Sequence, residues 1–118
     1  MKRVLILTFL LLGFAYLCGQ NDYYAQQAQS YQREAEYYTR QALGYEREEE
    51  YYNKQAQGYF RESDYYLKRK KYDSVRSYQQ RAMVAVDRAE NYARKAKNAR
   101  DRAQDYLKKA EDALKRAK

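Results

Sequence analysis

The side chains that could do chemistry in this chain are its tyrosines and its clustered carboxylates. The 118 residues include 16 tyrosines, one cysteine and no histidine. A catalytic tyrosine needs a neighbour that activates its hydroxyl, and no such neighbour stands out. The carboxylates of Glu46–Glu50 follow helical spacing, which is typical of a solvated or ion-paired helix face. The sequence therefore predicts a protein that is not an enzyme and that uses no metal or cofactor.

The N-terminal residues have the pattern of an export signal. Lys2 and Arg3 precede the apolar run Val4–Cys18, which is shorter than the ~20 residues that span a bilayer. We expect residues 1–19 to be a cleaved signal peptide, and the mature chain to be periplasmic or secreted, without a transmembrane span. The alternative is a lipid anchor on Cys18. Without that cysteine the mature chain has no disulfide to stabilise it.

A 14-residue repeat organises the next part of the chain. Its copies read DYYAQQAQSYQREA, EYYTRQALGYEREE, EYYNKQAQGYFRES and the degenerate DYYLKRKKYDSVRS. Fourteen residues are two heptads, and heptads indicate a coiled coil. With Ala28 at heptad position a, alanine occupies most a positions, and tyrosine occupies every d position from Tyr24 to Tyr66. The repeat thus predicts a long amphipathic helix with an Ala/Tyr seam.

The second half of the chain keeps the heptad in another frame, which begins at Val75. Alanine recurs at its a positions, and Tyr78, Tyr92 and Tyr106 alternate with alanine at d. At the change of frame, the basic run Lys68–Lys71 suits a helix C-terminus. We expect Asp73 or Ser74 to cap a new helix. The expected segments are an acidic helix over 20–66, a basic turn over 67–74 and a basic helix over 75–118.

Charge favours an antiparallel pairing of the two helices. Residues 20–66 carry five basic and nine acidic side chains, for a net charge of −4, whereas 67–118 carry seventeen and seven, for +10. Positions g of antiparallel helices face each other. The expected ion pairs are Glu62 with Arg81, Glu48 with Lys95 and Glu34 with Lys109 at the g positions, and Glu46 with Arg100 on the e side. The sequence predicts an all-α fold, an antiparallel coiled-coil hairpin; the alternative is one continuous helix that oligomerises.

The same register sets large side chains against small ones along the seam. Tyrosine of either helix faces alanine or serine in most layers, and alanine faces alanine in others, such as Ala56 with Ala85. Glu49 is the one charged seam residue, and it faces Tyr92. A polar a position can fix the register of a coiled coil. We therefore expect the carboxylate of Glu49 to bond the hydroxyl of Tyr92.

A second row of tyrosines lies at the c positions of the first helix, beside g. Small residues alternate with these tyrosines, so the flank runs bulky, small, bulky, small. Exposed aromatic stripes mark association surfaces, and we expect a tyrosine of a second molecule to lie over each glycine. The alternative is a local use, in which these rings make cation–π contacts with the Arg and Lys row of the second helix. The residues of this Tyr/Gly flank are Tyr23, Tyr37, Gly44, Tyr51, Gly58 and Tyr65.

The second helix carries a basic residue at each g position from 81 onward. In an exported protein this basic row suits an anionic glycan, lipid headgroup or other acidic envelope component better than nucleic acid. A further interpretation is a periplasmic holdase, similar to the basic helical-tentacle chaperones of outer-membrane proteins, although this chain has no β body. The residues of the basic row are Arg81, Arg88, Lys95, Arg102, Lys109 and Arg116.

Overall fold

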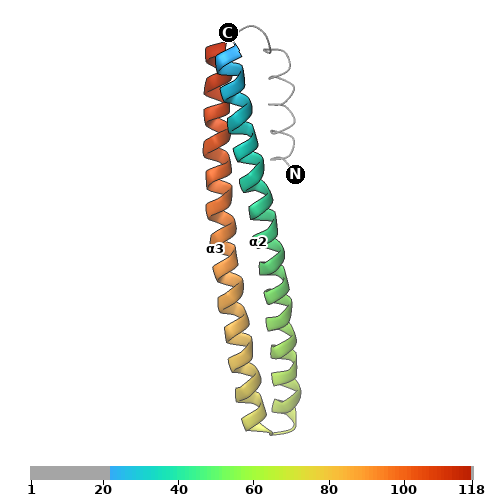
Figure 1. Ribbon diagram of the computed structural model, residues 1–118. Coiled ribbons are helices and arrows are strands. Elements are labelled where there is room, and N and C mark those ends of the chain that lie inside the picture. Colours follow the sequence, from blue (N-terminus) through green and yellow to red (C-terminus); the bar gives the residue numbers. More distant parts are fainter. Residues whose placement is uncertain (1–21, 118) are drawn as a thin grey trace. The chain divides into compact units, whose positions relative to one another are not determined.

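The computed structural model describes residues 22–117, so the expected signal peptide and Cys18 lie outside the described residues. Two long helices make up this part of the chain: α2 spans Asp22–Lys68 and α3 spans Tyr72–Ala117. The helices lie side by side and antiparallel, and the described residues contain no strand (Figure 1). The predicted all-α hairpin is confirmed, and the alternative of one continuous helix is wrong.

The described chain divides into two units, and each contains a stretch of both helices. The terminal unit joins the residues of α2 up to Ala42 to those of α3 from Asn98 onward. The turn unit is Leu43–Lys97 and includes the turn between the helices. Each unit has its own contacts across the seam, and the candidate site described below is built mainly in the turn unit.

A Schellman motif ends α2. The backbone amide of Lys70 donates to the carbonyl of Leu67 at 3.0 Å, and that of Lys71 donates to the carbonyl of Tyr66 at 3.1 Å. Lys70 has a φ of 59°, the left-handed conformation that this motif requires at its C′ position. The carbonyls of Tyr66 and Leu67 are thereby satisfied, and the chain reverses direction within one helical turn.

The turn is shorter than the expected 67–74, because only residues 69–71 lie between the helices. The amide of Val75 donates to the carbonyl of Lys71, so α3 is under way before the residues expected to cap it. The predicted cap at Asp73 or Ser74 is therefore wrong. Asp73 lies in the first turn of α3, where the helix dipole stabilises a negatively charged side chain. Its carboxylate pairs with Arg76.

Alanine forms most of the buried seam between the helices. In the terminal unit, Ala28 of α2 packs with Ala113 and Leu114 of α3, and Tyr31 covers them. In the turn unit, Ala56 and Ala85 are both buried. Because an alanine buries little apolar area, the half-buried tyrosines beside it must supply much of the hydrophobic stabilisation.

Gln32 is a buried polar side chain in the terminal unit. Only 1% of its surface is exposed, and neither its Oε1 nor its Nε2 has a hydrogen-bond partner among the described residues. A buried amide without partners destabilises the folded state. Gln32 occupies an e position at the rim of the heptad, so the repeat pattern alone does not predict its burial.

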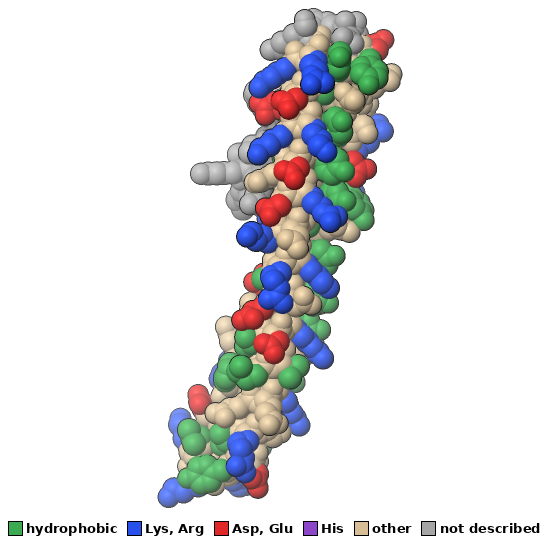
Figure 2. All heavy atoms as spheres, turned by 90° about the vertical axis from the view of Figure 1, so that its left-hand side faces the viewer, with side chains coloured by type: hydrophobic (Ala, Val, Ile, Leu, Met, Phe, Trp, Pro, Cys, Tyr) green, Lys and Arg blue, Asp and Glu red, His purple; other side chains and the backbone are tan. Residues whose placement is uncertain are grey.

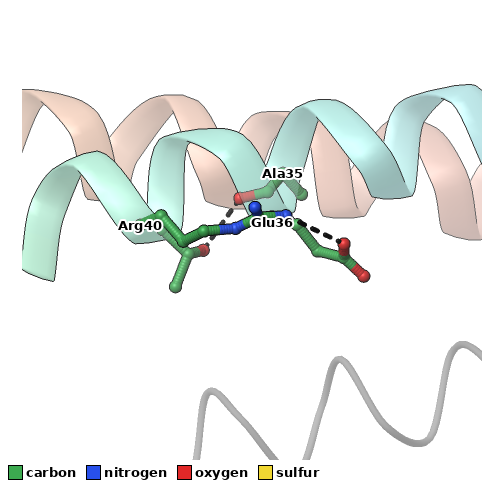
Figure 3. A network of polar contacts seen from close by, with 4 residues as sticks. Ala35, Glu36 and Arg40 are labelled. Carbon is green, nitrogen blue, oxygen red and sulfur yellow. Dashed lines mark hydrogen bonds and ion pairs between the residues drawn. The ribbon is translucent and has the colours of Figure 1, made fainter.

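Charged side chains on the outer surface pair along their own helix. Figure 3 shows Arg40 beside Glu36, with Nη2 and Oε2 separated by 3.6 Å. The hydroxyl of Thr39, in the same turn, donates to the carbonyl of Ala35 at 2.8 Å. Exposed pairs four residues apart contribute about 0.3–0.5 kcal/mol each. Such pairs support one helix but do not join it to its neighbour.

Candidate interaction surface

The tyrosines of the two helices gather in clusters of four. Tyr92 of α3 stacks on Tyr52 of α2, with ring centroids 5.8 Å apart and planes 7° apart. Its other side meets Tyr45, with centroids 6.1 Å apart. Tyr51 packs edge-on against Tyr52, with centroids 5.1 Å apart and planes 77° apart. These four residues are the first tyrosine cluster of the turn unit.

The same cluster recurs at 14-residue steps along both helices. Each copy has one ring of α3 between two seam rings of α2, and an exposed ring that meets one of them edge-on. The same ring contacts form at every step because the tyrosines of both helices recur with a 14-residue period. The other clusters are Tyr59, Tyr65, Tyr66 and Tyr78 in the turn unit, and Tyr31, Tyr37, Tyr38 and Tyr106 in the terminal unit.

Members of the basic row lie over the tyrosine rings. The guanidinium carbon of Arg88 lies 5.6 Å from the ring centroid of Tyr52, and Nζ of Lys95 lies 5.1 Å from that of Tyr92. Such cation–π contacts contribute about 0.5–1 kcal/mol each at exposed sites. Of the other predicted residues in this row, Arg81, Arg102 and Lys109 make ring contacts, and Arg116 is exposed in the last turn of α3.

The three ion pairs expected between g positions do not form among the described residues. Glu48 and Glu62 are exposed, and neither reaches the Lys95 or Arg81 expected to pair with it. Glu34 and Lys109 in the terminal unit do not pair either. The physical reason is the tyrosine at each d position, because its ring attracts the cation that would otherwise extend toward the carboxylate.

The Tyr/Gly flank lies on the outside of α2. Tyr51 and Tyr65 are 55% and 48% exposed, and Tyr23 and Tyr37 are exposed as well. A Cβ added at Gly58, or at Gly44, would meet no atom within 4 Å. The glycines are therefore open gaps between exposed rings, as the sequence pattern predicts. Their use in association stays a prediction.

Hydrogen bonds within α2 hold two of the exposed rings. The side-chain amide of Gln55 donates to the hydroxyl of Tyr51 at 3.2 Å, and that of Gln41 donates to the hydroxyl of Tyr37 at 2.9 Å. Tyr65 has a different neighbour, since the guanidinium of Arg69 lies 3.5 Å from its ring centroid. Each ring also has its edge-on tyrosine contact, so each exposed tyrosine has defined neighbours.

The Tyr/Gly flank and the basic row meet on one face of the turn unit. Tyr51 reaches Tyr52 from the flank, and Arg88 reaches the same ring from α3. Figure 2, which looks onto α3, shows Lys and Arg side chains following one another with hydrophobic side chains beside them. The flank and the basic row together form a single aromatic and basic face.

A groove of about 280 Å³ lies on this face between the two clusters of the turn unit. It forms where the small Ala56 and Ala85 occupy the seam, so that no ring fills the surface above them. Sequence reasoning identified this alanine layer but not the groove. The residues that line it are Gln55, Tyr59, Ser77, Gln80, Arg81, Val84, Ala85 and Arg88.

Glu49 and Tyr92 do not form the expected hydrogen bond in the described structure. Glu49 is half-buried, and the ring of Tyr92 stacks on Tyr52 and contacts the tilted ring of Tyr45. The ring contacts therefore define the observed register. Whether the charge of Glu49 also selects this register stays a prediction.

Residues 22–117 contain no group of three or more metal-ligating side chains, and neither α2 nor α3 has an apolar stretch long enough to cross a membrane. Comparison of the chain with protein-family models, curated proteins and solved structures found no match. The aromatic and basic face is therefore the feature from which a function can be inferred.

Proposed function

We propose that this protein is a non-enzymatic helical hairpin that acts as a structural or interaction element, and that it associates with copies of itself through the Tyr/Gly flank. The observation that carries the proposal is the alternation of exposed, ordered rings with open gaps, as at Tyr51, Gly58 and Tyr65. The pattern of an export signal at residues 1–19 supports a periplasmic or secreted location.

The order of the exposed rings favours association. Tyrosine is enriched at protein interfaces because its ring buries much apolar area while its hydroxyl can still bond water or a partner. An ordered side chain also loses less conformational entropy on binding than a free one. Tyr51 is held by Tyr52 and by Gln55 before any partner arrives. The flank is therefore preorganised for contact with another surface.

Sedimentation velocity of the full chain across concentrations tests the proposal. We expect the wild type to associate as concentration rises, and Tyr37→Ser combined with Tyr51→Ser to weaken association while circular dichroism remains helical. Tyr72→Ser is the matched control, because Tyr72 is equally exposed but lies outside the flank. A wild type that stays monomeric, or a double variant that associates as well as the wild type, would overturn the proposal.

A second candidate function is binding of an anionic envelope component by the basic row. The observation that favours it is that Arg88, Lys95 and Arg102 are exposed and form no ion pair among the described residues. Binding to an acidic polysaccharide or to anionic vesicles should fall steeply as salt rises. Replacing the three residues with glutamine should abolish it. Absence of any salt-dependent binding by the wild type would exclude this function.

A further inference from the structure

We propose that the turn unit pairs with a second copy so that α3 of one copy lies antiparallel across α2 of the other, about a two-fold axis parallel to the helices. The face that becomes buried is the aromatic and basic face described above. This inference deepens the proposed self-association and rests on it. It specifies which helix of the second copy the Tyr/Gly flank contacts, and in which direction.

Charge selects this arrangement over the pairing of like helices. Glu48 and Glu62 lie at g positions of α2, exposed and without an ion pair among the described residues. If α2 lay antiparallel on α2, the carboxylates of the two copies would face each other, and the basic rows would face each other as well. Like charges brought together at an interface are unfavourable. Laying α3 across α2 sets acidic residues against basic ones instead.

The observed register fixes which residues would meet. Within one copy, Tyr92 is level with the midpoint between Tyr45 and Tyr52. A two-fold axis parallel to the helices keeps residues at the same level in the second copy. Glu48 is then within one helical turn of Lys95 of the second copy. By the same count, Glu62 is close to Arg81 of the second copy.

Side-chain size agrees with the charges at these levels. Gly58 lies less than half a helical turn from the level of Val84, which is 50% exposed and lines the groove. Tyr51 is offset from the level of Asn91 by the same amount, and its exposed ring would meet a smaller side chain there. Val84 of the second copy would fill the open space at Gly58 and cover the groove. The tyrosine-over-glycine contact expected from the sequence requires α2 on α2, which the charges disfavour.

Directed disulfide formation tests the orientation. The experiment uses two full-length variants that both contain Cys18→Ser. The first also carries Gly58→Cys, the second carries Val84→Cys, and a mass tag on one of them distinguishes the two. A disulfide needs Cα atoms within about 7 Å. We expect the mixed product, which joins position 58 of one chain to position 84 of the other, to dominate, and Gly58→Cys alone to give little dimer. A dominant disulfide between two copies of Gly58→Cys would overturn the inference, because it would place α2 on α2.

Charge reversal provides a second test with its own control. Glu48→Lys with Glu62→Lys, and Arg81→Glu with Lys95→Glu, should each weaken self-association at least tenfold in sedimentation. Mixing the two variants should restore dimers, while Arg94→Glu, on the outer side of α3, should have little effect. Failure to restore dimers on mixing would overturn the inference and leave self-association standing. A monomeric wild type would instead overturn the proposed function itself.

Discussion

Tyr66 stacks on Tyr78 across the hairpin beside the turn, with ring centroids 5.5 Å apart and planes 11° apart. The pKa of Tyr66 is raised above its ordinary value of 10.0, first by the charge of the neighbouring Tyr78, then by partial burial, and then by the carboxylate of Glu62. A raised pKa in the folded state means that the folded protein holds the proton more tightly than the unfolded chain does.

The stability of the hairpin should therefore fall at alkaline pH. The contribution of Tyr66 is complete below pH 10.0 and is lost as the pH rises through the raised pKa of the folded state. Urea unfolding at a series of pH values measures the slope, and Tyr66→Phe should make it shallower. Tyr78→Phe should bring the titration of Tyr66, followed by the NMR signals of its ring, to lower pH. An unchanged slope in Tyr66→Phe would contradict the prediction.

The stack of Tyr52 on Tyr92 should contribute to stability beyond the area that each ring buries. Stacked aromatic pairs show coupling energies of about 0.5–1.5 kcal/mol in double-mutant cycles. We expect a value in this range from urea unfolding of Tyr52→Ala, Tyr92→Ala and the double variant. The pair Tyr51 and Tyr92, which is not in ring contact, provides the control cycle. A coupling energy near zero for the stacked pair would count against the ring contact.

The hydroxyl of Tyr92 should matter much less than its ring. The structure shows no hydrogen bond between Tyr92 and Glu49, so Tyr92→Phe retains the contacts with Tyr45 and Tyr52. We expect Tyr92→Phe to change the free energy of unfolding by less than about 0.5 kcal/mol. A loss of about 1 kcal/mol or more, the usual size for a lost hydrogen bond, would show that Glu49 bonds the hydroxyl in solution.

Replacing Lys70 with glycine should stabilise the turn. Lys70 has a φ of 59°. This left-handed conformation is strained for a residue with a Cβ but is readily adopted by glycine. Its amide also forms a bond of the Schellman motif, which glycine preserves. We expect Lys70→Gly to raise the free energy of unfolding by about 0.5–1 kcal/mol. Lys70→Ala removes the charge but keeps Cβ, so a comparable gain in that control would assign the effect to charge.

Much of this fold could be predicted because a single period recurs in both helices. The 14-residue repeat sets Tyr45, Tyr52 and Tyr59 on one line of α2, and Tyr78 and Tyr92 recur at the same interval in α3. Because the tyrosines of the two antiparallel helices have the same spacing, alignment of one cluster aligns all the others. The opposite net charges of the segments then favour the hairpin. The seam and its register therefore follow from simple spacing.

The contacts of the basic row could not be predicted with the same rules. The pairing of g positions in coiled coils is known from seams of aliphatic residues, where a cation is free to extend toward a carboxylate. In this seam the ring of Tyr52 reaches the flank and attracts Arg88. The burial of Gln32 and the short turn at 69–71 are likewise missed, because both depend on three-dimensional packing and backbone geometry that a heptad pattern does not describe.

Substitutions at Gly58 should affect the stability of the helix and the self-association of the protein differently. Alanine there meets no atom within 4 Å and is a better helix former than glycine by about 1 kcal/mol. We therefore expect Gly58→Ala to raise the free energy of unfolding by about 0.5–1 kcal/mol and to leave the protein able to dimerise. Gly58→Leu should form the helix as readily but fill the space proposed for Val84 of the second copy. Sedimentation should then show that Gly58→Leu weakens association at least tenfold, whereas Gly58→Ala does not. Equal dimerisation of the two variants would mean that the space at Gly58 is not part of the interface.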